Sequence, residues 1–204
     1  MTARGRLVAL EGIDGCGKST QARALAEALG AHLTHEPGAT ELGATLRGVL
    51  LAPEAAAVSI RAEALLMAAD RAEHVAQVIE PALAAGQWVV TDRFSGSTLA
   101  YQGYGRGLDV PALAGLVAWA TGGLAADLSI LIDVTVEVAA GRLASSAPDR
   151  LERLGAEFAS RVRQGFLALA AGDPEHWVVV DGTFDPSSLT ARIVALVRER
   201  LGGG

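Results

Sequence analysis

Lysine is almost absent from this sequence of 204 residues, because only one of its 17 lysine and arginine residues is a lysine. That residue is Lys18, and the remaining 16 are arginines. Cysteine is equally rare: Cys16 alone cannot form an internal disulfide or a cysteine-based zinc site. The net charge of −6 argues against a broad basic surface for nucleic acid, although local arginine clusters can still bind phosphates.

A long apolar run is also missing. The longest uncharged stretch is Val110–Ala126, whose seventeen residues include Pro111 and two adjacent glycines. It is shorter than the roughly 20 apolar residues that span a bilayer, so we expect a buried helix or a helix at a subunit contact, and no membrane partner. The first apolar segment starts at Leu7 and leaves no signal peptide, so we expect a cytoplasmic protein.

Apolar segments with strand and helix spacing alternate along the chain, which predicts an α/β fold with a parallel sheet. Half of the residues are apolar and 20% are charged, and the length fits a single domain over residues 1–204. The predicted strands are Leu7–Leu10, His32–His35, Trp88–Thr91, Ser129–Ile132 and Trp177–Val180. The predicted helices are Lys18–Leu29, Leu42–Leu51, Ile60–Ala84, Val110–Thr121, Val136–Ala144, Leu154–Ala171 and Ser188–Leu201.

Residues 12–19 read GIDGCGKS, which matches the phosphate-binding pattern G-x-x-x-x-G-K-S. The motif lies between a predicted strand and a predicted helix, where its mechanism requires it. Its glycines let backbone N–H groups converge on phosphates, and the helix dipole adds to that positive field. Lys18 would then reach the outer phosphates, and the Ser19 hydroxyl would bind Mg²⁺. A glycine-rich turn without a ligand is the alternative.

Polar residues follow the other predicted strands at the sheet edge where ligands of such folds bind. They include Asp92 and Arg93, followed by an aromatic and amide-rich segment, residues 94–102, that suits a flat hydrogen-bonding ring or a loop with a buried tyrosine. Residues 103–107 predict a flexible, glycine-punctuated loop. Arg71 falls on the apolar stripe of its helix, so it either pairs with a structural carboxylate or faces a ligand-filled cleft.

The segment around residues 143–153 predicts an arginine-bearing lid. Ser145–Pro148 interrupt two helical stretches, and the run DRLER follows at residues 149–153. A solvated helical turn with ion pairs three residues apart is the alternative.

Several of these segments together resemble the bacterial thymidylate kinases over nearly the whole chain. The matching segments are residues 10–20, 36–40, 46–51, 69–74, 92–103, 105–107, 133–135 and 149–152. The resemblance implies a P-loop nucleoside-monophosphate-kinase fold with a five-stranded parallel sheet flanked by helices. It also implies phosphoryl transfer from ATP to dTMP in dTTP synthesis, Mg²⁺, and a homodimer. The apolar faces of Ile60–Ala84 and Val110–Thr121 are the candidate dimer contacts, and Trp119 is either core or interface.

The resemblance also implies a role for each matching residue. The ATP-binding residues would be Gly12, Ile13, Asp14, Gly15, Cys16, Gly17, Lys18, Ser19, Thr20 and, near the adenine, Arg142. The dTMP-binding residues would be Glu36, Pro37, Arg47, Met67, Arg71, Arg93, Thr98, Tyr101 and Gln102. Of these, Arg47 and Arg93 would hold the phosphate and Arg71 and Thr98 the base, while Tyr101 would favour deoxyribose. Ser19 and Asp92 would bind Mg²⁺.

The acceptor is a phosphate oxygen, which is already ionised, so the site must supply alignment and positive charge and not a general base. Lys18, Arg93 and Asp14 are candidates for this catalytic work. Members of the family carry a further catalytic arginine in the phosphate loop or in the lid. Gly15 and Cys16 occupy the loop positions here, so the resemblance implies a lid arginine, Arg150, with Arg153 in reserve.

Two positions depart from the family pattern. His35 stands where an arginine usually precedes the Glu-Pro-Gly segment, and Met67 stands where a phenylalanine usually stacks on the base. Methionine packs against a ring but specifies it less sharply. A P-loop kinase acting on another monophosphate or on a deoxynucleoside therefore remains an alternative, as does a nucleotide-binding regulatory module.

Overall fold

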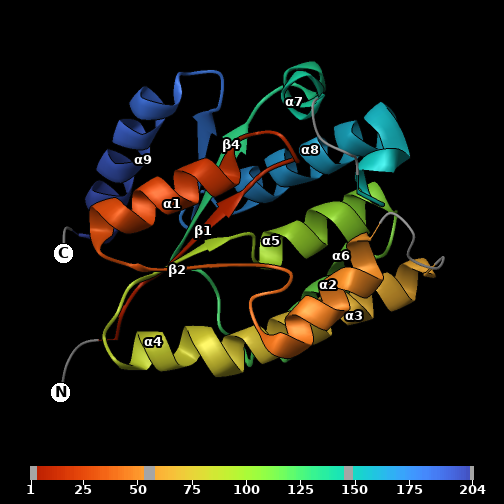
Figure 1. Cartoon of the computed structure of the whole chain (residues 1–204), viewed down its shortest axis with the longest axis horizontal. Helices are drawn as coiled ribbons and strands as arrows, with labels where there is room; N and C mark the ends of the chain where they lie inside the picture. Colours follow the sequence, from red (N-terminus) through yellow and green to blue (C-terminus); the bar gives the residue numbers. More distant parts are fainter. Residues whose placement is uncertain (1–3, 53–57, 145–148, 203–204) are drawn as a thin grey trace.

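Five parallel strands form the centre of the molecule in the order β2-β3-β1-β4-β5 (Figure 1). The computed structural model describes residues 4–52, 58–144 and 149–202. The strands are β1 (Leu7–Glu11), β2 (His32–His35), β3 (Val89–Asp92), β4 (Leu128–Asp133) and β5 (Trp177–Asp181). All five lie where the sequence predicts them, with ends that differ by one residue at most, and the parallel pairing confirms the predicted fold class.

Strand β1 is central because it is apolar on both faces, as a strand inside a parallel sheet must be. Leu7 and Ala9 pack into one apolar cluster, and Val8 and Leu10 pack into another on the opposite face. With β3 on one side and β4 on the other, the carboxyl end of β1 lies beside the carboxyl ends of both neighbours. The residues after β1 therefore start in the middle of this sheet edge.

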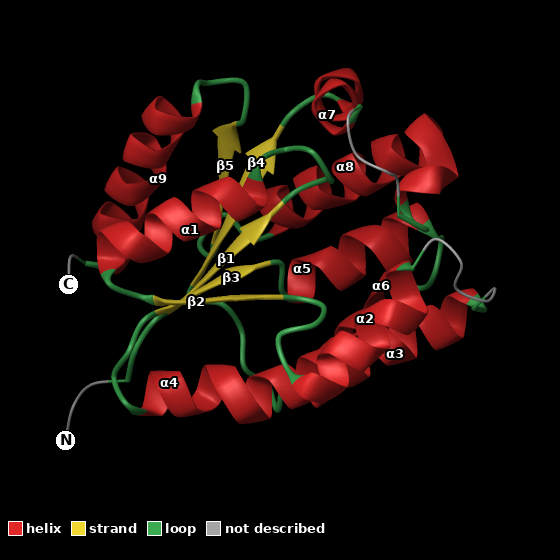
Figure 2. Cartoon of the chain, in the orientation of Figure 1, coloured by secondary structure: helices red, strands yellow, loops and turns green. Residues whose placement is uncertain are grey.

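Helices cover both faces of the sheet (Figure 2). On one face, α1 contacts α9, and on the other the helical segment from α3 to α4 supplies the apolar side chains that meet β1 and β3. The longer helices are α1 (Lys18–Leu29), α2 (Glu41–Leu51), α3 (Ile60–His74), α6 (Val110–Ala120), α7 (Val136–Leu143), α8 (Gly155–Gly172) and α9 (Pro186–Leu201). None of the helices in the described ranges is long and apolar enough to cross a membrane.

Side-chain caps explain where several helices begin. An oxygen on the residue before each helix accepts a backbone N–H of the first turn, which satisfies a donor that the helix itself leaves free. These capping residues are Thr40 before α2, Ser59 before α3, Asp109 before α6, Thr135 before α7 and Asp185 before α9. The cap at Asp185 lets α9 start at Pro186, two residues before the predicted start.

The predicted helix Ile60–Ala84 is one path with a wider turn inside it. Helix α3 runs into a π-helical turn, η1 (Val75–Ile79), and then into α4 (Glu80–Ala84). Pro81 lies in the first turn of α4 and has no backbone N–H to give to the preceding turn. The wider π-helical turn before Pro81 changes the hydrogen-bonding pattern, and the segment therefore stays helical without that N–H.

The prediction of a flexible loop over residues 103–107 is wrong for residues 103–105, and the segment 94–102, for which a loop was one alternative, is helical from Ser95 on. Residues after β3 form α5 (Ser95–Thr98) and then a π-helix, η2 (Leu99–Gly105). Two glycines of this helical segment are sites of close packing. A Cβ on Gly96 would lie 2.5 Å from the Trp177 ring, and one on Gly105 would lie 2.7 Å from the Phe158 ring.

Glu11, at the end of β1, fixes the start of this helical segment. Its carboxylate is fully buried and accepts the backbone N–H groups of Phe94 and Ser97 at 3.1 and 3.2 Å, and the Ser97 hydroxyl at 2.6 Å. Burial raises the pKa of Glu11 to about 7, despite these hydrogen bonds and the nearby positive charge of Arg93. The protonated form is therefore favoured by folding.

The raised pKa of Glu11 predicts a pH dependence of stability. Between pH 4.5 and about 7 the folded chain holds a proton that the unfolded chain releases, so the free energy of unfolding should fall as pH rises. Glu11→Gln should remove this fall, worth up to about 3 kcal/mol, because the amide can keep both backbone bonds while the Ser97 hydroxyl reverses. Urea titrations of both proteins at pH 4.5 and 8 measure the difference; equal pH slopes would contradict the prediction.

Candidate active site

The phosphate loop connects β1 to α1 and opens into a cavity. Gly12, Gly15 and Gly17 have φ angles of +142°, +81° and +103°, which only glycine adopts easily, so the motif's glycines are required by the backbone. The Lys18 side chain is buried, and its Nζ donates to the carbonyl of Ile13 at 2.9 Å. We call this the loop cavity; it is lined by Asp14, Gly15, Gly17, Lys18, Ser19, Thr20, Ala22, Arg23, Leu33, Thr34, His35, Glu36, Arg47, Asp92, Arg93, Leu143 and Glu152.

Ser19 and Asp92 meet at the floor of the loop cavity. The Ser19 hydroxyl donates to one Asp92 carboxylate oxygen at 2.5 Å, and the other oxygen, Oδ1, is buried without a hydrogen-bond partner in the described structure. A hydroxyl beside an orphaned carboxylate oxygen fits Mg²⁺, which takes one or two protein ligands and completes its shell with water and phosphate oxygens. No group of three or more His, Cys, Asp or Glu side chains that could hold a metal is found within the described ranges.

Arg93 follows β3 in a left-handed conformation, with a φ angle of +74°. Its guanidinium donates to the Gly12 carbonyl at 3.1 Å, to the Ser97 hydroxyl at 3.0 Å and to the Tyr101 hydroxyl at 3.1 Å, and it forms an ion pair with Asp14. These four partners fix the guanidinium. The unusual backbone is held by the Leu10 carbonyl, which accepts the Arg93 N–H at 2.9 Å, and by the Thr91 hydroxyl, which donates to the Arg93 carbonyl at 2.8 Å.

Asp14 carries the charge that balances Arg93. It also accepts a hydrogen bond from the Tyr101 hydroxyl at 2.7 Å. Burial raises the pKa of Asp14, but the positive charges of Arg93 and Lys18 outweigh this effect and lower the pKa to about 2. Asp14 is therefore ionised at neutral pH, and Arg93 is paired.

Arg71 pairs with a carboxylate and also lines a cavity. Its guanidinium pairs with the buried Glu36 carboxylate at 2.8 Å and donates to the Thr98 hydroxyl at 2.8 Å and to the Phe94 carbonyl at 2.9 Å. Glu36 in turn bonds the buried ring of His74 at 2.9 Å. Arg71 nevertheless lines a cavity, so its carboxylate partner orients it and does not remove it from the site.

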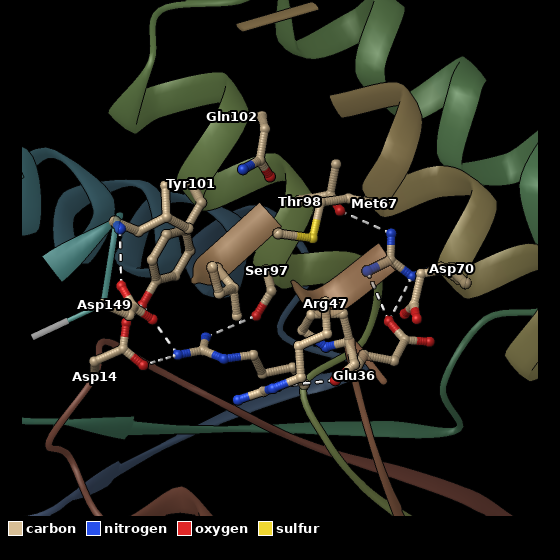
Figure 3. A pocket seen from close by; sticks show the side chains of 15 residues that line it. Asp14, Glu36, Arg47, Met67, Asp70, Ser97, Thr98, Tyr101, Gln102 and Asp149 are labelled. Atoms are coloured by element: carbon tan, nitrogen blue, oxygen red, sulfur yellow. Dashed lines mark hydrogen bonds and ion pairs between the residues drawn. The ribbon is translucent and has the colours of Figure 1, made fainter. Parts of the chain in front are cut away.

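A second cavity, which we call the Met67 pocket, lies beside the loop cavity (Figure 3). Figure 3 shows Met67, Thr98 and Gln102 on one side of this pocket and Asp14, Glu36 and Arg47 on the other. Arg47 reaches it from α2 and donates to the Pro37 carbonyl at 2.8 Å. The lining residues are Asp14, Glu36, Pro37, Arg47, Leu51, Met67, Asp70, Arg71, Arg93, Ser97, Thr98, Tyr101, Gln102, Asp149 and Leu151. The structure thus brings together all nine residues predicted for dTMP.

Asp14, predicted for ATP binding and catalysis, also lines the Met67 pocket, and five further lining residues were not predicted for any individual role: Leu51, Asp70, Ser97, Asp149 and Leu151. Asp70 accepts the backbone N–H of Gly38 at 2.9 Å and so holds the turn after Glu36 and Pro37. Its position next to Arg71 on a buried helix face was a usable signal. Leu51 and Leu151 resemble ordinary core residues, and their place in the site depends on how α2 and the lid meet.

The predicted lid is described only in part, because Ser145–Pro148 lie outside the described residues. Arg142, before this segment, donates to the carbonyls of Cys16 at 3.1 Å and Gly182 at 2.8 Å, so it lies against the phosphate loop. Arg150 donates to the Glu63 carboxylate at 2.6 Å and is not among the described residues that line either cavity. Arg153 lies in a short 3₁₀ turn, η3 (Glu152–Leu154).

Comparison with known proteins agrees with this geometry. A sequence profile described as thymidylate kinase matches residues 10–193. The thymidylate kinase of Synechococcus sp. (strain RCC307) is 49% identical over 209 residues, covering 97% of this chain and 98% of that protein. The thymidylate kinase of Chromobacterium violaceum is 46% identical over 204 residues, covering 97% and 95%. The chain belongs to the thymidylate kinase family.

A solved structure of the family supports the same conclusion. The crystal structure of thymidylate kinase from Ehrlichia chaffeensis superposes with a TM-score of 0.80 at 31% identity and covers 96% of this chain and 99% of that one. The fold is therefore that of a P-loop nucleoside monophosphate kinase, and the chain is a kinase that phosphorylates dTMP to dTDP in dTTP synthesis.

Proposed function

We propose that the chain, as a single-domain cytoplasmic enzyme, uses Mg-ATP as donor in the loop cavity and binds dTMP in the Met67 pocket. The observation that carries this assignment is that Asp14, Glu36, Arg47 and Arg93 line both cavities. Phosphates entering from the two sides would meet at these shared residues, which is the arrangement that direct transfer between two nucleotides needs. A cytoplasmic location accords with ATP and dTMP, which are both intracellular metabolites.

The donor side follows from the phosphate loop. The backbone of Gly12, Ile13, Asp14, Gly15, Cys16 and Gly17, together with Lys18, Ser19 and Thr20, would hold the ATP phosphates. Ser19 and Asp92 would hold Mg²⁺, which neutralises charge on the donor phosphates. By the resemblance, Arg142 would lie near the adenine; in the structure its guanidinium bonds the loop carbonyl of Cys16 at 3.1 Å.

On the acceptor side, Arg47 and Arg93 would bind the dTMP phosphate. Arg71 and Thr98 would bond the thymine ring, and their mutual hydrogen bond of 2.8 Å aligns the two groups. Tyr101 would crowd the 2′ position and Gln102 would line the same pocket. The acceptor oxygen is already ionised, so these residues contribute alignment and charge, and none of them has to remove a proton.

A panel of acceptors tests the assignment of the Met67 pocket. Acceptor-dependent ADP formation should be strongest with dTMP among dTMP, dUMP, UMP, dCMP, AMP and thymidine. Turnover led by another monophosphate would overturn the base assignment.

Met67→Phe should lower the Kd of dTMP by about tenfold or less, because a rigid ring stacks on thymine more firmly than a flexible thioether. An unchanged or higher Kd of dTMP in a titration would show that Met67 is not the stacking residue.

Arg150 is our candidate for the lid arginine that stabilises the transferring phosphoryl group, because Gly15 and Cys16 bring no charge to that point. To act so, its guanidinium must leave Glu63. Arg150→Ala should lower kcat about tenfold or more, equivalent to ~1.4 kcal/mol, with little change in dTMP affinity. Arg198→Ala is the matched control, since Arg198 lies on the exposed face of α9. Near-normal turnover of Arg150→Ala would refute this role.

We also propose a homodimer through α3 and α6, which contact each other. Leu65 on α3 is 57% exposed and Trp119 on α6 is 83% exposed, so Trp119 does not belong to the core. Exposed apolar side chains on two neighbouring helices are typical of a subunit contact.

Trp119→Asp should therefore convert the dimer to a monomer without unfolding the chain, because it places a charge in the apolar contact. Sedimentation velocity measures the change, and circular dichroism checks the fold. The control is Glu199→Gln on α9, which should leave the mass unchanged. A wild-type protein that is monomeric at micromolar concentration would contradict the proposal.

A further inference from the structure

Glu63 on α3 is a buried carboxylate shared by two arginines. Its side chain is fully buried. One oxygen accepts Gln102 Nε2 at 3.0 Å and Arg106 Nε at 3.1 Å, and the other accepts Arg106 Nη2 at 2.7 Å and Arg150 Nη2 at 2.6 Å. Glu63 therefore joins three parts of the molecule: the π-helix η2, the residue after it, and the lid.

The charges at this point do not balance. Burial alone would raise the pKa of Glu63, but the hydrogen bonds from Arg106, Gln102 and Arg150 outweigh it and leave the pKa below its usual value. Glu63 is thus ionised at neutral pH and carries one negative charge against two guanidiniums. The surplus positive charge favours an anion nearby as a further partner.

Arg106 and Arg150 are not held equally. Arg106 makes two hydrogen bonds to Glu63, one to each oxygen, whereas Arg150 makes one and uses its Nε for the Leu50 carbonyl at 2.6 Å. If Arg150 left, Glu63 would keep three hydrogen bonds from Arg106 and Gln102. Breaking a buried ion pair is usually costly because it leaves an unpaired buried charge. Glu63 would stay paired with Arg106, so this cost would not arise.

The backbone around Arg150 lies against both cavities while its guanidinium points to α3. Asp149 and Leu151 line the Met67 pocket, and Glu152 lines the loop cavity. A reciprocal pair of hydrogen bonds fixes this turn, because Asp149 Oδ1 accepts the Glu152 N–H at 2.9 Å and Glu152 accepts the Asp149 N–H at 3.0 Å. The residues on both sides of Arg150 are thus already held beside the two cavities.

We propose that Glu63 is a positioning residue that holds Arg150 away from the phosphates until both nucleotides are bound, and that Arg106 sets how easily Arg150 leaves. This inference rests on the catalytic role proposed for Arg150. The proposed arrangement would protect bound ATP from hydrolysis. With Arg150 held on Glu63, water is a poor acceptor in the reaction ATP + H₂O → ADP + phosphate + H⁺, and the phosphoryl group is kept for dTMP.

Two substitutions test the proposal because it predicts opposite results for them. Glu63→Gln removes the charge that holds Arg150, so ADP formation without dTMP should rise by about threefold or more, with dTMP-dependent kcat changed less than about twofold. Arg106→Gln leaves Arg150 as the single arginine on a buried carboxylate, so its release costs more. That variant should lose about fivefold or more in dTMP-dependent kcat without any rise in ATP hydrolysis.

Two further variants complete the set. Glu73→Gln, on the same helix, should leave both rates unchanged. Combining Glu63→Gln with Arg150→Ala should abolish the extra hydrolysis, because the released arginine is what causes it. ADP is measured with and without saturating dTMP, and thermal unfolding checks each variant. Arg106→Lys, which keeps the charge, should recover part of the kcat lost in Arg106→Gln.

A purely structural role would lower both rates in Glu63→Gln and Arg106→Gln alike, and that result would overturn the proposal. If Glu63→Gln does not fold, normal kcat in Arg106→Gln is enough to overturn it. Failure of the underlying assignment is distinct: Arg150→Ala would then keep its turnover. If Arg150→Ala loses turnover while Glu63→Gln leaves hydrolysis unchanged, the present inference alone fails.

Discussion

Positive charge that is buried must be paired, and this constraint governs the whole site. Two bound nucleotides require several cationic groups in one place, yet an unpaired guanidinium is costly to bury. The fold pairs four of its arginines with carboxylates: Arg93 with Asp14, Arg71 with Glu36, and both Arg106 and Arg150 with Glu63. Asp14 and Glu36 orient Arg93 and Arg71 as well as neutralising them, so this part of the site is arranged before any phosphate arrives.

Much of the fold could be predicted because apolar periodicity and the phosphate loop agree with each other. The strands of a parallel sheet are apolar on both faces and stand out as short runs, and α1 begins at Lys18 because the loop ends there. The segment from Ser95 to Gly105 could not be predicted in the same way. Its glycines are typical of loops, and only the positions of Trp177 and Phe158 show that they are spaces required by packing.

The residues of the candidate site also differ in whether the sequence could predict them. Residues that belong to a continuous motif, such as Lys18 and Ser19, could be placed at the site from the sequence, and the resemblance named nine of the residues that line the Met67 pocket. Glu63 could not be found in this way. From the sequence it is an ordinary acidic residue near a helix start, and its partners Arg106 and Arg150 are 43 and 87 residues away. Such long-range pairs carry no local signal, since they exist only once the sheet has placed the helices.

The single lysine has a practical consequence. Lys18 is the one side-chain amine in the chain; it lines the loop cavity, and its Nζ donates to the Ile13 carbonyl. Amine-directed reagents such as acylating nucleotide analogues therefore have one side-chain target, and it lies in the cavity proposed for the donor phosphates. Covalent labelling at that position would report directly on donor-site occupancy, without the background from surface lysines that obscures such experiments in most proteins.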